Sequence, residues 1–149
     1  MDALQLLEED HDKVKKIMSH IEGTTEGGVK TREEFYGKLK AELIVHEAIE
    51  EEILYPALKD HPRAKDLVLE AYEEHNVIDM VMAEIDETPV DDETWGAKFT
   101  VMKENLEHHI DEEESEMFDQ CRKVFDPDEL MELGDEMEAR KEELESANA

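Results

Sequence analysis

The stretch that decides the fold runs from Leu43 to Pro56 and reads LIVHEAIEEEILYP. It places His46 and Glu50 four residues apart within a segment of helical periodicity. On a helix, positions i and i+4 lie on one face, one turn apart. An imidazole and a carboxylate spaced in this way can both reach one point in the core of a helical bundle.

A second stretch, residues 105–118, reads NLEHHIDEEESEMF and repeats the arrangement with His109 and Glu113. Two further histidines, His11 and His75, lie alone within apolar stripes of helical spacing. Together the two pairs and the two lone residues supply four histidines and two carboxylates. This is a ligand set suited to two iron-type metal ions held between the helices of a bundle.

Length and composition favour one all-α domain covering residues 1–149. The chain is long enough to bury a real core, and it contains only 4 proline and 6 glycine residues. Glutamate, leucine, lysine, methionine and alanine dominate, and all five are good helix formers. The expected architecture is an up-down-up-down four-helix bundle over residues 2–120, with a short fifth helix over about 127–145.

Net charge and cysteine content narrow the class of partner. The formal net charge of −28 is expected to repel nucleic acids and anionic membranes. A solvated acidic surface is the ordinary interpretation, and a high-salt cytoplasm or a basic partner is the alternative. The single cysteine, Cys121, excludes an intramolecular disulfide framework. No apolar run approaches the ~20 residues that span a membrane and no signal peptide is visible, so the expected location is the cytoplasm.

Turn and capping residues set the expected helix limits. The run GTTEGG at residues 23–28 is expected to end the first helix. Thr31 is the expected N-cap of the second helix, Asp91 or Asp92 that of the fourth, and Asp126 that of the fifth. The predicted helices cover residues 2–21, 31–59, 63–87, 92–117 and 127–145, and residues 146–149 are expected to fray.

A test of register supports one common level for the six candidate ligands. With hinges centred near residues 26, 61 and 89, antiparallel helices bring His11, His46, Glu50, His75 and His109 to within about 5–9 Å of one level, at ~1.5 Å per residue. A single histidine in an apolar stripe is ordinarily a core residue. Here inward carboxylates accompany the histidines, and an unpaired inward charge would be costly. A metal site is therefore favoured, and iron, manganese and zinc all suit these ligands.

The remaining polar residues carry weaker expectations. Tyr55 lies nine residues after His46, on the opposite side of an ideal helix, but a bend near Pro56 would make it a pocket residue. His20, His61 and His108 are expected at the surface. Five acidic residues lie near the candidate ligands: Glu47, Glu51, Glu52, Glu112 and Glu114. Their ordinary interpretation is a solvated helix face. The alternative is that one of them contacts a metal ligand from behind.

At these residues the chain resembles the hemerythrin-like, or HHE cation-binding, family. The resemblance rests on the lone histidines, the two His-x-x-x-Glu pairs and the local text EEDHDKV, HEAIEEEILYPAL, EEHNVID and HHIDEEESEMF. It implies an up-down bundle holding a non-haem di-iron centre. Two iron ions, oxo- or hydroxo-bridged, would also be bridged by Glu50 and Glu113. The tail resembles the closing helix of small stand-alone bacterial, mycobacterial-type members.

The chain departs from the oxygen-carrying hemerythrins in two ways. Asp79 stands four residues after His75, at a position where those proteins have a histidine. Those proteins also have an aspartate five residues after the last ligand histidine, whereas this chain has Glu113 four residues after His109. One histidine ligand is thus missing, and Asp79, Tyr55, water or peroxide are candidates for the open position. The resemblance therefore implies handling of hydrogen peroxide, oxygen or nitric oxide.

Three functional hypotheses follow. The first is an enzyme that decomposes peroxide or protects against oxidative stress. The second is a protein, expected to be a monomer, that binds or senses oxygen, nitric oxide or iron. The third is a bundle whose histidines are structural and hold no metal. Iron content separates the third hypothesis from the others, and oxygen release from peroxide separates the first from the second.

Overall fold

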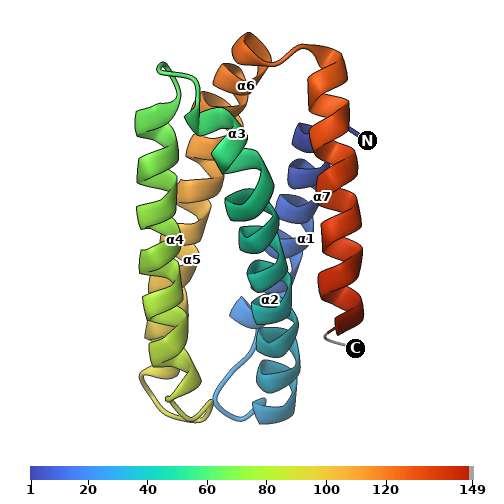
Figure 1. Cartoon of the computed structure of the whole chain (residues 1–149). Helices are drawn as coiled ribbons and strands as arrows, with labels where there is room; N and C mark the ends of the chain where they lie inside the picture. The colour runs from blue at the N-terminus through green and yellow to red at the C-terminus, as the bar shows by residue number, and fades with distance from the viewer. Residues whose placement is uncertain (148–149) are drawn as a thin grey trace.

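The computed structural model describes residues 1–147, and within this range the regular structure is entirely helical. Figure 1 shows the long helices running alternately down and up, with the last helix lying outside the others. The elements are α1 (Ala3–Glu22), α2 (Val29–Ile49), η1 (Glu50–Leu54), α3 (Tyr55–Lys59), α4 (Lys65–Asp86), α5 (Trp95–Glu112), η2 (Glu113–Met117), α6 (Phe118–Val124) and α7 (Pro127–Ala147). The predicted all-α class is confirmed.

Capping residues explain where two of the helices begin. At α1, the Asp2 carboxylate accepts from the backbone N–H of Gln5 at 2.9 Å, and the Gln5 side chain accepts from the Asp2 N–H at 3.0 Å. At α7, Asp126 and Glu129 form the same reciprocal pair at 2.8 and 3.1 Å. Each pair satisfies two donors that the first turn of a helix leaves free. The predicted Asp126 cap is confirmed.

Two other predicted caps are wrong. Helix α2 begins at Val29 directly after Gly28, so Thr31 lies inside the first turn and caps nothing. Helix α5 begins later than expected, at Trp95. Asp92 instead accepts from the backbone N–H of Thr94 at 2.8 Å and from its hydroxyl at 2.6 Å, which forms a local turn.

The two π-helical turns, η1 and η2, change which residues face the core. In a π turn the backbone bonds run from i+5 to i, so one extra residue enters the turn. Continued at α-helical spacing, the face of His46 and Glu50 would next present Ile53 and Ala57 to the core, whereas the structure buries Leu54 and Leu58 completely and leaves Ile53 and Ala57 partly buried. The α-helical expectation is wrong here because η1 advances the helix face by one residue.

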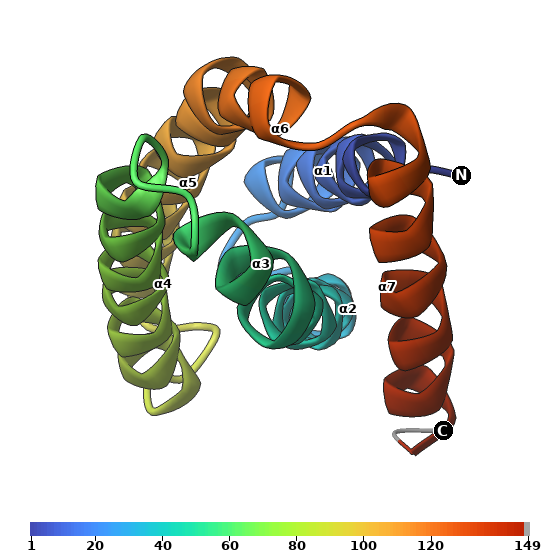
Figure 2. The same cartoon turned by 45° about the horizontal axis from the view of Figure 1, so that its top comes forward.

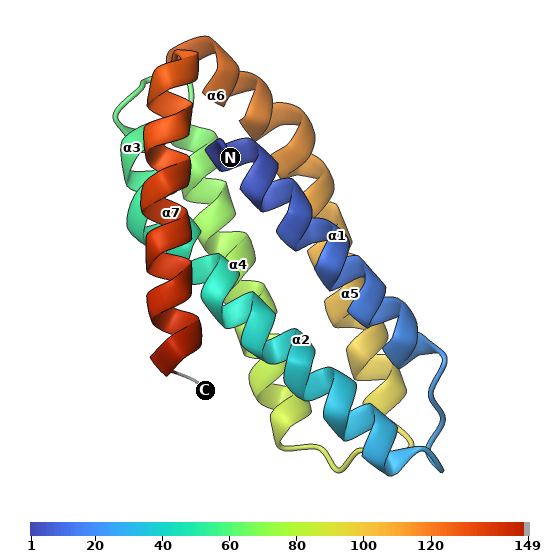
Figure 3. The same ribbon diagram turned by 90° about the vertical axis from the view of Figure 1, so that its right-hand side faces the viewer.

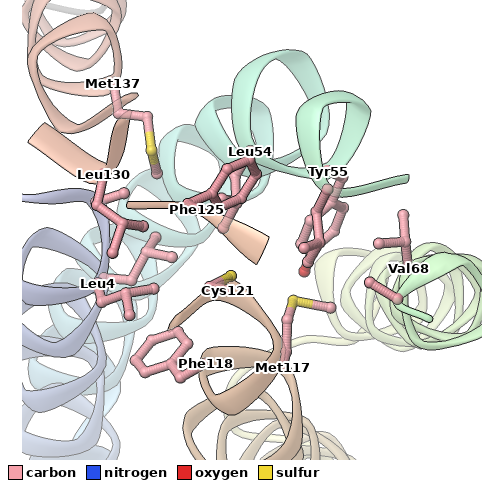
Figure 4. Packing of buried hydrophobic residues seen from close by; sticks show 14 of the residues in the cluster. Leu4, Leu54, Tyr55, Val68, Met117, Phe118, Cys121, Phe125, Leu130 and Met137 are labelled. Atoms are coloured by element: carbon pink, nitrogen blue, oxygen red, sulfur yellow. The ribbon is translucent and has the colours of Figure 1, made fainter. Parts of the chain in front are cut away.

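The core consists of two apolar clusters with a polar layer between them. One cluster fills the end of the bundle near α3, α6 and α7, and it includes Tyr55, Phe118 and Cys121 (Figure 4). The other cluster fills the opposite end around Trp95 and Phe99. On the helices that carry candidate ligands, those ligands lie between the two clusters. Apolar packing therefore isolates the polar layer from water at both ends.

The fifth helix is not short. Helix α7 has 21 residues, as many as α2, and it packs against α1 and α2 (Figures 2 and 3). Gly134 permits this approach, because a Cβ atom there would collide with the Met1 carbonyl oxygen and the Asp2 backbone. The helix continues through Ala147. The expectation that residues 146–149 fray is therefore wrong for residues 146 and 147. Residues 148 and 149 lie outside the described residues.

Candidate metal centre

The fold brings all six predicted ligands into the polar layer and buries each of them. They form two groups of three, and in each group one ligand atom from every residue lies within 4.8 Å of the others. The first group is His11, His46 and Glu113, and the second is Glu50, His75 and His109. The exposed fractions range from 0% for Glu50 to 6% for His46.

Glu50 contacts a histidine from each group. Its Oε1 atom lies 3.1 Å from Nε2 of His46 and 3.2 Å from Nε2 of His75. His46 and Glu50 are the i, i+4 pair on one helix, whereas His75 reaches the same oxygen from α4. The carboxylate of Glu50 therefore lies between the two groups.

Glu113 occupies the equivalent position on the other side. Its Oε1 atom lies 3.1 Å from Nε2 of His11, and its Oε2 atom lies 3.4 Å from Nε2 of His109. Burial raises the pKa of Glu113, but the close approach of Glu50, His109 and His11 outweighs burial and leaves this pKa well below its ordinary value. Glu113 is thus ionised in the interior of the bundle.

Several of these buried atoms have no hydrogen-bond partner within the described residues. They are Nε2 of His11, His46 and His109, both carboxylate oxygens of Glu50, and Oε1 of Glu113. An unsatisfied buried polar group costs about 1–3 kcal/mol, and native proteins contain few of them. Imidazole nitrogens and carboxylate oxygens converging in this way form a donor set that fits iron, manganese or zinc.

The other nitrogen of every ligand histidine contacts a carboxylate. The Nδ1 distances are 2.6 Å for His11 to Glu114, 3.0 Å for His46 to Asp10, 2.9 Å for His75 to Glu51 and 2.9 Å for His109 to Glu74. A carboxylate at Nδ1 accepts the ring proton there and leaves Nε2 free to bind a metal. The four carboxylates therefore hold the histidine rings in the orientation that metal binding needs.

The sequence allowed one such carboxylate among the nearby glutamates, but Asp10 and Glu74 were not predicted, although the sequence contains a signal for all four. Asp10 and Glu74 each directly precede a lone histidine. Glu51 and Glu114 each directly follow the glutamate of a His-x-x-x-Glu pair. Glu51 and Glu114 take the alternative position behind a ligand rather than a solvated face, because one carboxylate oxygen of each lies at Nδ1 of a ligand histidine.

Tyr55 lies in the centre rather than opposite to it. Its hydroxyl donates to Oε2 of Glu113 at 2.7 Å and lies 3.4 Å from Nε2 of His75. The turn η1 explains this position, since the Tyr55 N–H bonds to the Glu50 carbonyl and brings residues five apart onto one face. Figure 4 shows the ring directed into the bundle beside Met117.

The other candidates lie elsewhere. Asp79 is exposed and belongs to neither group, so it does not occupy a ligand position in this structure. Glu47 is buried rather than solvated, and burial and the neighbouring Asp79 raise its pKa to about 8 in spite of His75. His20 and His108 are exposed, and His61 is half-buried against Phe125.

The charges of the two carboxylates also act on the histidines of the second group. Burial alone would lower both pKa values. The nearby carboxylate of Glu50 nevertheless raises the pKa of His75 to about 9. The contact with Glu113 and the hydrogen bond with Glu74 raise the pKa of His109 to about 10. Without metal these histidines hold protons, which a metal ion must displace.

Two small cavities adjoin the centre. One, of about 10 Å³, is lined by the four histidines, by Glu47 and by apolar side chains such as Val14, Ile78 and Leu106. The second, also of about 10 Å³, lies between α4 and α5 beside His109 and Glu113. Each volume is close to that of one water-sized sphere, so only very small molecules fit beside the ligands.

The chain is similar to known proteins over nearly its whole length. The chain is 30% identical over 145 residues to two uncharacterized proteins, Rv2633c of Mycobacterium tuberculosis and Mb2666c of Mycobacterium bovis, a match spanning 97% of this chain and 88% of each relative. A crystal structure of a hemerythrin HHE cation-binding domain-containing protein from Mycobacterium kansasii, an Rv2633c homologue, superposes with a TM-score of 0.89 and 29% identity. That match covers 99% of this chain and 89% of the other.

No helix within residues 1–147 combines the length and the apolar character needed to cross a membrane. The family model described as the hemerythrin HHE cation-binding domain matches residues 2–121, which include all six candidate ligands and Tyr55. The chain therefore belongs to the hemerythrin HHE cation-binding domain family.

Proposed function

We propose that this protein is a non-haem di-iron protein whose up-down four-helix bundle decomposes hydrogen peroxide. Its ligands are His11, His46 and Glu113 for one ion, and Glu50, His75 and His109 for the other. Glu50 and Glu113 would each help to hold both ions, since each carboxylate contacts histidines of both groups. The observation that carries the metal assignment is the convergence of buried, unpartnered nitrogen and oxygen atoms on one point.

When bound there, two iron ions supply two-electron redox chemistry. The conversion of two molecules of hydrogen peroxide into one oxygen and two water molecules requires such chemistry, since one peroxide is oxidised and the other is reduced. The protein holds the ligand atoms in place through the carboxylates at each Nδ1 atom. The apolar clusters on both sides exclude bulk water.

Tyr55 supports an enzymatic rather than a purely carrying role. Burial and the charges of Glu113 and Glu50 raise its pKa well above the usual value, so the phenol keeps its proton at Oη. That proton lies within reach of any small molecule bound beside Glu113 and His75. Cleavage of an O–O bond needs a proton for the departing oxygen, and Tyr55 is the positioned donor.

Two measurements test the proposal in sequence. Metal analysis of freshly purified protein is expected to find about two irons per chain, with an absorption band in the near ultraviolet from bridged ferric ions. The iron-loaded protein is then expected to release oxygen from hydrogen peroxide. A metal-free chain that folds and melts identically with and without ferrous iron would contradict the metal assignment.

The second candidate is reversible binding of oxygen or nitric oxide. The apolar wall of the cavity beside the four histidines favours it, because small diatomic molecules are apolar and fit a volume of about 10 Å³. An iron-loaded protein that binds these gases reversibly but releases no oxygen from peroxide would replace the enzymatic proposal with this one.

A further inference from the structure

One of the four carboxylates behind the histidines differs from the rest. The side chain of Asp10 is 5% exposed, whereas the side chains of the others are 25% exposed for Glu74, 33% for Glu114 and 38% for Glu51. Asp10 is therefore the one whose second oxygen cannot rely on bulk water. A buried carboxylate needs a further donor for that oxygen.

Helix α7 supplies this donor. Nζ of Lys141 lies 2.5 Å from Oδ1 of Asp10, while Oδ2 of Asp10 lies 3.0 Å from Nδ1 of His46. Within residues 1–147, Asp10 is the only one of the four carboxylates that contacts a lysine or an arginine. A continuous chain of contacts thus runs from α7 through α1 to the ligand on α2.

We propose that Lys141 is a positioning residue for His46, through which α7 secures the metal ion of the first group. With Lys141 in place, both oxygens of Asp10 are fixed and the ring of His46 is fixed with them. Without it, Asp10 is left buried with one oxygen unpartnered, and it can turn away from His46. The ion held by His75 and His109 has no such connection to α7.

This inference rests on the proposed two-ion site and concerns the unequal retention of its ions. Groups that orient a ligand histidine typically change metal affinity 10–100-fold when they are altered. Lys141→Met keeps the length of the side chain and removes its charge. It is expected to speed the loss of one iron per chain about tenfold and to leave the other unchanged.

The test uses the full chain loaded with ferrous iron without oxygen. Release is followed as a coloured complex with an excess of a ferrous chelator, and the rate and the amplitude of each phase are fitted. The matched control is Arg140→Met, which removes the neighbouring cation on α7. Arg140 contacts Glu52 at 2.8 Å, and Glu52 touches no candidate ligand. Lys141→Arg is the conservative variant and is expected to retain both irons.

Double variants assign the accelerated phase. Asp10→Asn is expected to accelerate the same phase as Lys141→Met, and the two changes together are expected to add little, because they break one chain of contacts. Glu74→Gln, which acts on His109, is expected to accelerate the other phase. Its combination with Lys141→Met is expected to accelerate both phases.

The inference is overturned if Lys141→Met releases both irons at the rates of the unmodified protein, if it accelerates both equally, or if Arg140→Met has the same effect. The last result would show that general docking of α7 matters and that Lys141 does not act through Asp10. An unmodified protein that binds no iron would overturn the proposed site as well. Because the readout is metal release, a lack of peroxide turnover would contradict the proposed function alone.

Discussion

Two segments of the chain share one pattern of ligands and one local structure. The first is formed by α2, η1 and α3, and the second by α5, η2 and α6. Each carries a histidine, a glutamate four residues later at the start of a π turn, and a second glutamate directly after it. In both, the first glutamate lies between the two ligand groups. The second glutamate contacts Nδ1 of a lone histidine on another helix. Glu51 contacts His75, and Glu114 contacts His11.

The two segments differ five residues after the glutamate of the His-x-x-x-Glu pair. The first has Tyr55, whose hydroxyl reaches Glu113, and the second has Phe118, whose ring lies parallel to His11 at 6.3 Å. The histidine partners differ as well, since α7 contacts Asp10 and leaves Glu74 without a lysine. Shared residues therefore build the metal site, and the differing residues make its two halves chemically unequal.

Removal of the shared carboxylates is expected to have the largest effect. Glu50→Ala or Glu113→Ala removes a group that contacts both halves, so iron content is expected to fall from about two to below one per chain. The melting temperature of the iron-loaded protein should fall with it, since metal binding is linked to folding. Metal analysis and thermal melting check both expectations. His108→Ala is the control, because that ring is exposed, and full iron loading in the double glutamate variant would refute the assignment.

Removal of the Tyr55 hydroxyl is expected to have the next largest effect. Tyr55→Phe makes the first segment resemble the second, and it removes the proton donor while keeping the ring. Oxygen release from peroxide is expected to fall about 100-fold with iron content unchanged. Tyr72→Phe is the matched control, since its hydroxyl faces a backbone carbonyl 3.5 Å away. Equal turnover in the two variants would remove Tyr55 from the mechanism.

The paired outer glutamates test how far the two segments are equivalent. Glu51→Gln and Glu114→Gln each replace a carboxylate at a ligand Nδ1 atom, and each is expected to weaken binding of one ion about tenfold. Competition with a metal chelator measures both affinities. Glu116→Gln, at an exposed position of η2, is expected to change neither. Unequal effects of the first two variants would show that the segments are alike in sequence only.

The smallest expected effect is a pH dependence of the metal-free protein. The pKa values of His75 and His109, about 9 and 10 when folded, lie above the unfolded value of about 6.5. The folded state therefore binds more protons, so this stability is complete below pH ~6.5 and is lost as the pH rises toward 10.

The melting temperature of the metal-free protein is accordingly expected to fall by several degrees between pH 7 and 10. Metal-bound histidines hold no proton at Nε2, so the iron-loaded protein should show a weaker dependence. The pH series is measured on both forms in one buffer set. Equal slopes for the two forms would contradict the assigned protonation.

The sequence alone determined the helical class, the common level of the six candidate ligands and the pairing of two histidines with a glutamate four residues later. His46 with Glu50 and His109 with Glu113 could be recognised because an α-helix has one fixed period, so residues four apart must share a face. Trp95, Leu106 and Met117 share the face of His109 at the same helical spacing, and all three are buried for the same reason.

Only the tertiary structure decided the position of Tyr55, the choice of the carboxylates behind the histidines and the contact of Lys141 on α7 with Asp10. The π turn at Glu50 is a departure from the period on which the sequence argument rests, and it carried Tyr55 from the expected far side to the centre. Asp10, His46 and Lys141 come from three helices, and no local spacing relates them. Their contacts depend on which helices pack side by side, and that is set by the whole core rather than by any one stretch of chain.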